Sequence, residues 1–112
     1  MKESRDMRER AGYIMDYQTT DAVTAGVPVV VGNVVGIPNV TTEKGTEPVL
    51  LALATEGVFE LTKDTGAIDQ GAKVYLTAEK HIVATAEGNT YAGVAWSAAA
   101  EADTTVMVKI NA

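Results

Sequence analysis

The stretch GVPVVVGNVVGIP, residues 26–38, consists almost entirely of valine, isoleucine, glycine and proline, and it carries no charge, histidine or hydroxyl. β-Branched residues favour strands, whereas glycine and proline interrupt them. The stretch therefore predicts two short buried strands, at 28–31 and 34–37, punctuated by glycines and bounded by prolines. Because none of its side chains can act as an acid, base or nucleophile, we expect it to build a rigid body, with any binding surface elsewhere.

The rest of the chain after residue 12 follows the same pattern of short β-branched runs separated by turn-forming residues. Further strands are expected at 13–17, 49–54, 58–62, 73–77, 81–85, 91–97 and 104–110. The runs VFELTK and VMVKI alternate apolar and polar residues, which indicates one buried face and one solvent face. The runs VVV and VLLALA do not alternate and are expected to be buried on both faces. The predicted fold class is all-β: a compact small barrel or sandwich of short strands.

Two segments of the chain align with each other without gaps. VGIPNVTTEKGTEPVLLAL (35–53) aligns on AGVAWSAAAEADTTVMVKI (92–110), so that Gly36 meets Gly93 and Ile37 meets Val94. The alignment predicts two similar β-units, at 25–53 and 70–110, and chance similarity between Val- and Ala-rich segments is the open alternative. The domain prediction is a charged N-terminal arm at 1–12 and a single β domain at 13–112.

The composition excludes several function classes. The net charge of −6 argues against non-specific nucleic-acid binding, which needs a basic surface. No apolar run approaches the roughly 18 residues of a membrane span, and MKESRDMRER lacks the apolar core of a signal peptide. The absence of cysteine rules out disulfides and thiolate metal sites. We expect a protein made in the cytoplasm that binds neither nucleic acid nor membrane.

The residue inventory offers little chemistry. His81 is the only histidine, so a zinc site would need three carboxylates, and we expect His81 to lie at the surface or rim of the domain. The two serines, Ser4 and Ser97, lie outside any nucleophile-elbow sequence, and the glycine-rich segments lack the lysine of a phosphate-binding loop. The acid pairs sit in turn-like polar segments, where solvated carboxylates are the simpler interpretation. The sequence predicts no enzyme, no catalytic residue, no metal and no cofactor.

Charge is distributed unevenly along the chain. Residues 1–12 hold Lys2, Arg5, Arg8 and Arg10 against three acids, a balance of +1, whereas the remaining residues hold five lysines against twelve acids, a balance of −7. All three arginines lie in the first ten residues. The apolar content there is too low to hold a helix or strand on a core, and helices shorter than about 12 residues are marginal alone. The first twelve residues are therefore predicted to be an arm that orders against a partner.

The ordered set AGVPVVVGNVVGIP, GTEPVLLALATEGVFELTKD, IDQGAKVYLT and GNTYAGVAWSAAAEADTTVMVKIN resembles the family of small phage capsid cement, or head decoration, proteins. The likeness covers roughly residues 20–112. It implies a structural virion protein without enzymatic activity that binds the outer surface of an icosahedral phage head. It implies the major capsid protein as partner and a homotrimer at three-fold or quasi-three-fold sites, clamping neighbouring capsid subunits from the capsid exterior.

Within that expectation, the capsid-contact residues are predicted to lie in the arm and the first strand. They are Lys2, Arg5, Arg8 and Arg10, which would pair with capsid carboxylates, and Tyr13 and Tyr17, which would anchor apolar contacts. The alternative function is a host- or glycan-binding β module displayed on a virion or cell surface, which predicts an exposed aromatic patch. A small enzyme is the other rival, and it would need a cleft that gathers His81 with acids.

Overall fold

The computed structural model describes residues 14–112. The predicted arm at 1–12, and with it Lys2, Arg5, Arg8 and Arg10, lies outside the described residues, as does Tyr13. Within 14–112 the chain forms strands and turns and no helix, so this part contains no helix long and apolar enough to cross a membrane. The nine strands are β1 (Ile14–Thr19), β2 (Val29–Val31), β3 (Val34–Pro38), β4 (Val49–Ala54), β5 (Val58–Thr62), β6 (Lys73–Leu76), β7 (Ile82–Val83), β8 (Thr90–Ala95) and β9 (Thr105–Ile110).

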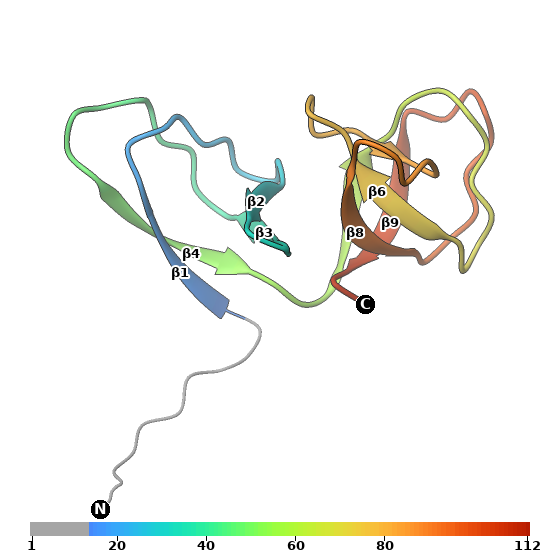
Figure 1. Cartoon of the computed structure of the whole chain (residues 1–112), viewed down its shortest axis with the longest axis horizontal. Helices are drawn as coiled ribbons and strands as arrows, with labels where there is room; N and C mark the ends of the chain where they lie inside the picture. Colours follow the sequence, from blue (N-terminus) through green and yellow to red (C-terminus); the bar gives the residue numbers. More distant parts are fainter. Residues whose placement is uncertain (1–13) are drawn as a thin grey trace, which may run out of the picture.

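All nine predicted strands are present, and the all-β fold class is confirmed. They form a four-stranded sheet in the order β1-β4-β3-β2 and a five-stranded sheet in the order β5-β9-β8-β6-β7. Figure 1 shows the two sheets side by side, with the five-stranded sheet curled into half a barrel. The first predicted unit, 25–53, contributes to the four-stranded sheet and the second, 70–110, to the five-stranded sheet. Their relation as a repeat stays a prediction.

The stretch 26–38 forms the β2–β3 hairpin, with Val31 paired to Val34 across a two-residue turn. Gly32 has φ of 60° at the first turn position, which is the type II′ geometry that matches the twist of adjacent strands. Val35 and Ile37 are buried, and they join the core formed by the five-stranded sheet rather than a core of their own sheet. The hairpin therefore closes the open side of the half-barrel and connects the two sheets.

The main core fills the half-barrel. It holds residues of every strand of the five-stranded sheet, together with two loop residues that pair across the barrel end, Ile68 and Ala99. Its members are Val35, Ile37, Leu61, Ile68, Val74, Leu76, Ile82, Ala92, Ala95, Ala99, Val106, Val108 and Ile110. A smaller core of Val23, Leu51 and Leu53 lies under β1 and β4. The two cores are unequal because β1 and β4 have only one covered face.

The expectation that VLLALA is buried on both faces was wrong. Along β4, Leu51 and Leu53 are buried, whereas Val49, Leu50 and Ala52 are exposed. The reason is that the smaller core covers only the face of β4 that carries Leu51 and Leu53, so Leu50 and Ala52 on the opposite face meet solvent. β3 pairs with β4 only at Ala54 and Leu53, so the rest of β4 pairs with β1 alone. This part of the sheet is a two-stranded ribbon with one face open to solvent. The VVV run of β2 is half-buried at all three positions rather than fully buried.

Candidate functional site

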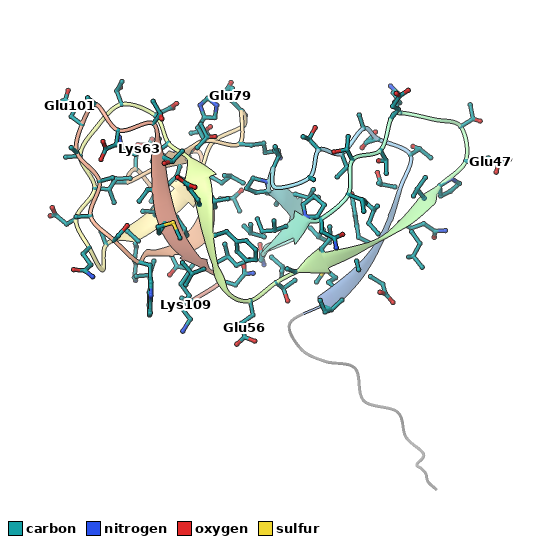
Figure 2. The ribbon with its side chains drawn as sticks, turned by 180° about the vertical axis from the view of Figure 1, so that it is seen from behind. Glu47, Glu56, Lys63, Glu79, Glu101 and Lys109 are labelled. Carbon is teal, nitrogen blue, oxygen red and sulfur yellow. The ribbon has the colours of Figure 1, made fainter. Side chains whose placement is uncertain are left out.

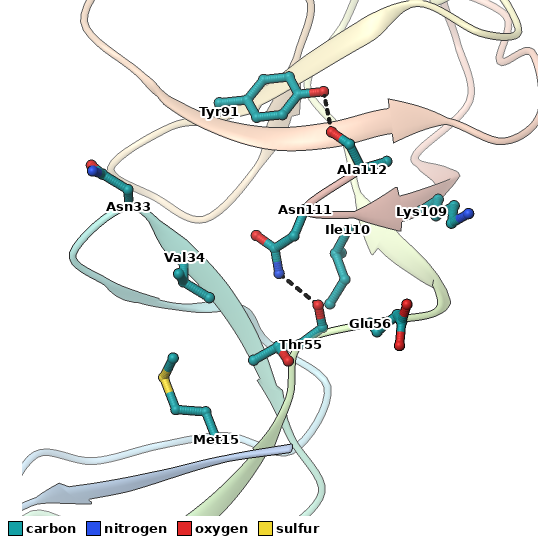
Figure 3. A pocket seen from close by; sticks show the side chains of 10 residues that line it. All are labelled: Met15, Asn33, Val34, Thr55, Glu56, Tyr91, Lys109, Ile110, Asn111 and Ala112. Carbon is teal, nitrogen blue, oxygen red and sulfur yellow. Dashed lines mark hydrogen bonds between the residues drawn. The ribbon is translucent and has the colours of Figure 1, made fainter. Parts of the chain in front are cut away.

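The two sheets are joined by the side chain of Asn111, directly after β9. Its carboxamide oxygen accepts a hydrogen bond from the Val35 amide at 3.0 Å, and its Nδ2 donates to the carbonyl oxygens of Val35 at 2.7 Å and Thr55 at 2.8 Å. Figure 3 shows the Asn111 amide reaching from the end of β9 toward Thr55. The carboxamide thus satisfies three backbone groups, one as acceptor and two as donor.

Beside the Asn111 hydrogen bonds lies a groove of about 650 Å³ between the sheets. Met15, Val34 and Ile110 supply its apolar lining, and Glu56 and Lys109 supply opposite charges. The Tyr91 hydroxyl donates to the Ala112 carbonyl oxygen at 2.7 Å, which holds the end of the chain against β8 (Figure 3). The groove therefore lies at the junction of the two sheets, where Asn111 and Tyr91 donate hydrogen bonds to backbone carbonyl oxygens.

Replacing Asn111 by alanine is expected to lower the free energy of unfolding by about 2 kcal/mol, because three partly solvated hydrogen bonds are lost and alanine tolerates the positive φ of 58° poorly. Asn111→Gly keeps the backbone conformation and removes only the bonds, so it should lie between wild type and Asn111→Ala. Urea unfolding followed by circular dichroism measures both. Equal stability of all three proteins would show that the Asn111 hydrogen bonds contribute nothing to the free energy of unfolding.

A second polar cluster lies at the end of β5, where the side chain of Lys63 is only 5% exposed. Its Nζ donates to three backbone carbonyl oxygens, those of Asp64 at 3.0 Å, Glu101 at 3.3 Å and Asp103 at 3.0 Å. An ammonium group has three donors, so this geometry satisfies it completely. Figure 2 shows Lys63 close to the loop that carries Glu101. Lys63 thus fixes the Ala-rich loop before β9 to the β5 end of the sheet.

His81 lies at the rim of the domain, as predicted, with its side chain 39% exposed. It is not solitary, since its Nδ1 lies 2.6 Å from Oδ1 of Asp64. Such a contact orients the imidazole and fixes which ring nitrogen faces the carboxylate. Within residues 14–112 there is no group of three or more His, Asp or Glu side chains that could hold a metal ion. The pair fixes the β6–β7 turn, where the His81 amide also bonds the Thr77 hydroxyl.

Of the predicted capsid-contact residues, only Tyr17 lies in the described part of the chain. It sits in β1 opposite Leu51, half-buried, and packs against the smaller core. Its ring therefore contributes to the fold of the ribbon, and its predicted role as an anchor stays a prediction. Lys2, Arg5, Arg8, Arg10 and Tyr13 stay predictions as well.

An apolar surface that was not predicted from the sequence lies on the outer face of the five-stranded sheet. Trp96 is 51% exposed, Met107 is 37% exposed, and Val58 is exposed beside them. The register places Val58 opposite Lys109, which is itself opposite Val94 on the other side, so these residues form one continuous face. The alternation in VMVKI, which predicted a solvent face containing Met107 and Lys109, was the available signal.

The exposed Trp96 ring bears on the glycan-binding alternative, which predicted an aromatic patch. Lys109 Nζ lies 5.2 Å from the centroid of that ring, a cation–π contact that occupies one ring face. Tyr75 and Tyr91 form an edge-to-face aromatic pair, with ring centroids 5.6 Å apart and an angle of 68° between the ring planes. Neither arrangement presents a pair of free, coplanar rings for stacking on sugars, so the structure gives no specific support for a glycan platform.

Fold and surface together define a small all-β protein with an exposed apolar face on its five-stranded sheet. The profile of the phage cement protein family matches residues 9–110, nearly the whole chain. The chain therefore belongs to the phage cement protein family, and the resemblance seen in the sequence is confirmed. No curated protein and no solved structure shows significant similarity to it. Membership implies a structural role, a phage capsid protein as partner, and location on the capsid of the virion.

Proposed function

We propose that this protein binds the outer surface of an icosahedral phage head as a homotrimer at three-fold or quasi-three-fold sites and clamps neighbouring major capsid subunits together. The observation that carries the proposal is the family match, which spans residues 9–110 and so includes Arg10, Tyr13 and Tyr17. Many copies, each joined to the shell at several points, turn small contact energies into resistance to internal pressure, because linked contacts raise effective affinity.

The grip on the capsid is assigned to residues 1–17. The body supports this assignment by its charge: residues 13–112 hold twelve acids against five lysines, and one of those lysines, Lys63, is buried. Such a surface is poorly suited to acidic patches on a partner. The arm carries Arg5, Arg8 and Arg10, whose planar guanidinium groups bind carboxylates bidentately.

Deleting residues 1–12 should leave a folded body that no longer saturates phage heads. All nine strands lie within 14–112, so the deletion removes no strand pairing. We expect apparent affinity for expanded heads to fall at least about tenfold, since each charge-assisted hydrogen bond contributes about 1.5 kcal/mol or more. Cosedimentation with expanded and unexpanded heads measures this. Full saturation by the truncated protein would reject the arm as the grip.

Matched substitutions separate arm charge from arm length. Replacing Arg5, Arg8 and Arg10 together by glutamine keeps the length and removes three positive charges, and it should weaken cosedimentation more strongly at low salt than at high salt. Tyr13→Ala tests the apolar anchor. Tyr17→Ala is a less clean test, because the Tyr17 ring packs on the smaller core opposite Leu51. Circular dichroism serves as the folding control for each variant.

A further inference from the structure

We infer that copies of this chain assemble head to tail: the exposed end of the β1–β4 ribbon of one copy docks on the outer face of the five-stranded sheet of the next. We name the first surface the ribbon knob, formed by Leu50 with Glu43 and Glu47. We name the second the sheet socket, formed by Val58, Val94, Trp96 and Met107 and flanked by Lys73 and Lys109. The inference rests on the proposed homotrimer and supplies its contact surfaces.

The ribbon knob exposes the largest apolar group at that end of the molecule. Leu50 is 66% exposed, more than any other large hydrophobic side chain in residues 14–112. It lies opposite Gln18 in a part of β4 that pairs with β1 only. A two-stranded ribbon is marginally stable alone, and a leucine on its open face adds no stability to the monomer. A docking partner would bury the Leu50 side chain and stabilise the ribbon.

The sheet socket is built by strand register. Lys73 is opposite Val94, Val94 is opposite Lys109, and Lys109 is opposite Val58, so basic and apolar residues alternate across four strands. A hollow of about 310 Å³ beside Trp96 is lined by Gln70, Gly71, Val94 and Ala95. A hollow next to an exposed tryptophan is the kind of place where an aliphatic side chain from a partner is fully desolvated.

The charges of the two surfaces are complementary. The ribbon end carries Asp21, Glu43 and Glu47 against Lys44, a balance of three acids to one base. The socket face carries Lys73 and Lys109 against Glu60, with Glu56 at its edge beside Lys109, so it is close to neutral on a body whose overall balance is −7. Knob against knob would bring an excess of acids together, whereas a knob in a socket brings those acids toward Lys73 and Lys109. Charge therefore favours a knob in a socket over knob against knob.

The positions of the two surfaces exclude an intramolecular contact. Figure 2 shows Glu47 at the far end of the ribbon and Lys109 on the other sheet, toward opposite ends of the molecule. A contact between two different surfaces is heterologous, and heterologous contacts form closed rings when the rotation between copies closes. A ring of three copies satisfies every knob and every socket, which is the assembly that a three-fold site on a head requires.

Leu50→Asp is the most direct test, because a change at an exposed side chain should leave the monomer folded. Sedimentation velocity over a concentration series should show a trimer for the wild type and a dissociation constant at least about thirtyfold higher for Leu50→Asp, as for an interface hot spot. Val27→Asp is the matched control, since Val27 is exposed to 39% and belongs to neither surface. Circular dichroism should be unchanged in both variants.

Charge reversal provides a second test of the proposed contact. Glu43→Lys with Glu47→Lys should weaken the trimer, as should Lys73→Glu with Lys109→Glu, and the combined fourfold variant should recover most of the loss. Restoration requires that the two charge sets face each other across an interface. If each pair weakens assembly and the combination weakens it further, the two surfaces do not meet and the inference is overturned.

Disulfide trapping tests the contact at the level of residues, because the chain has no cysteine of its own. A Leu50→Cys/Gln70→Cys protein should oxidise to a covalent ladder that ends at three copies on a denaturing gel. Each single-cysteine protein should remain monomeric on the gel, because a head-to-tail contact brings no two like cysteines together. A wild type that is monomeric at all concentrations, or a Leu50→Asp protein that remains trimeric, would overturn the inference.

These outcomes are distinguishable from failure of the proposed function. The arm-deleted protein should keep its trimer and lose binding to heads. The Leu50→Asp monomer should keep its arm and still bind heads, with affinity reduced by the loss of linked attachment. If Leu50→Asp stays trimeric while the arm deletion abolishes cosedimentation, the knob and socket are wrong and the capsid-binding proposal stands.

Discussion

Replacing Gly93 by alanine is expected to disrupt the five-stranded sheet and to cost more than about 3 kcal/mol of unfolding free energy. Gly93 lies in β8 between β9 and β6, opposite Ile110 on one side and Val74 on the other. A Cβ built at this position would lie 2.1 Å from the Lys109 carbonyl oxygen and 3.0 Å from the Ile110 Cα. Both obstacles are backbone atoms, so the clash is relieved only if β8 separates from β9.

The backbone conformation adds to this cost, because Gly93 has φ of 150°, outside the region that side-chain-bearing residues ordinarily adopt. Gly45→Ala is the matched control: Gly45 has open space around its Cα and no positive φ. Its stability should change by less than about 0.5 kcal/mol. Thermal unfolding followed by circular dichroism compares the two. A Gly93→Ala midpoint within about 3 °C of wild type would contradict the predicted clash.

The strands themselves could be predicted from the sequence because their signals are local. β-Branched runs and the glycines and prolines between them place β2, β3, β5 and β9 within one or two residues of their observed bounds. β7 is shorter than predicted, Ile82–Val83 rather than 81–85, because the chain leaves β6 after two pairs and turns toward β8. The local sequence pattern alone does not indicate over how many residues two strands pair.

Burial on each face was less predictable, because it depends on which strands become neighbours. The run VLLALA has the composition of a strand buried on both faces, yet Leu50 is exposed because the smaller core packs only on the opposite face of β4, against Leu51 and Leu53. Likewise Val35 and Ile37 belong to one sheet and are buried in the core of the other. Neither fact follows from periodicity, since both are set by contacts between residues distant in the chain.

Some of the candidate sites could be predicted from the sequence and others could not. The asymmetry of charge that marks Arg5, Arg8 and Arg10 is visible in the sequence, because it needs only a count along the chain. The sheet socket is not visible there, because Val58, Val94 and Trp96 become neighbours only through the β5-β9-β8 register. The hydrogen bonds of Asn111 and Lys63 escape notice for the same reason, since both residues end strands that otherwise look unexceptional.

Replacing Lys63 by methionine is expected to cost about 3 kcal/mol, because methionine fills the space and leaves three carbonyl oxygens without a donor. Those carbonyls belong to Asp64, Glu101 and Asp103, so the loss should appear first as faster amide exchange in the loop before β9. Lys44→Met is the matched control, since Lys44 is exposed on the ribbon end and its loss should change stability by less than about 0.5 kcal/mol.

The origin of the Lys63 effect can be separated from surface electrostatics by salt. A buried ammonium that donates to backbone carbonyls is screened little, so the stability difference between wild type and Lys63→Met should be the same at about 0.05 M and about 1 M salt. Lys63→Arg keeps the charge but offers a planar fork in place of three diverging donors, so it should recover only part of the loss. If salt abolished the difference, or if arginine restored full stability, charge alone would explain the effect. Retention of the difference would assign it to the three-fold match between ammonium donors and carbonyl acceptors, the interaction that holds the Ala-rich loop on the half-barrel.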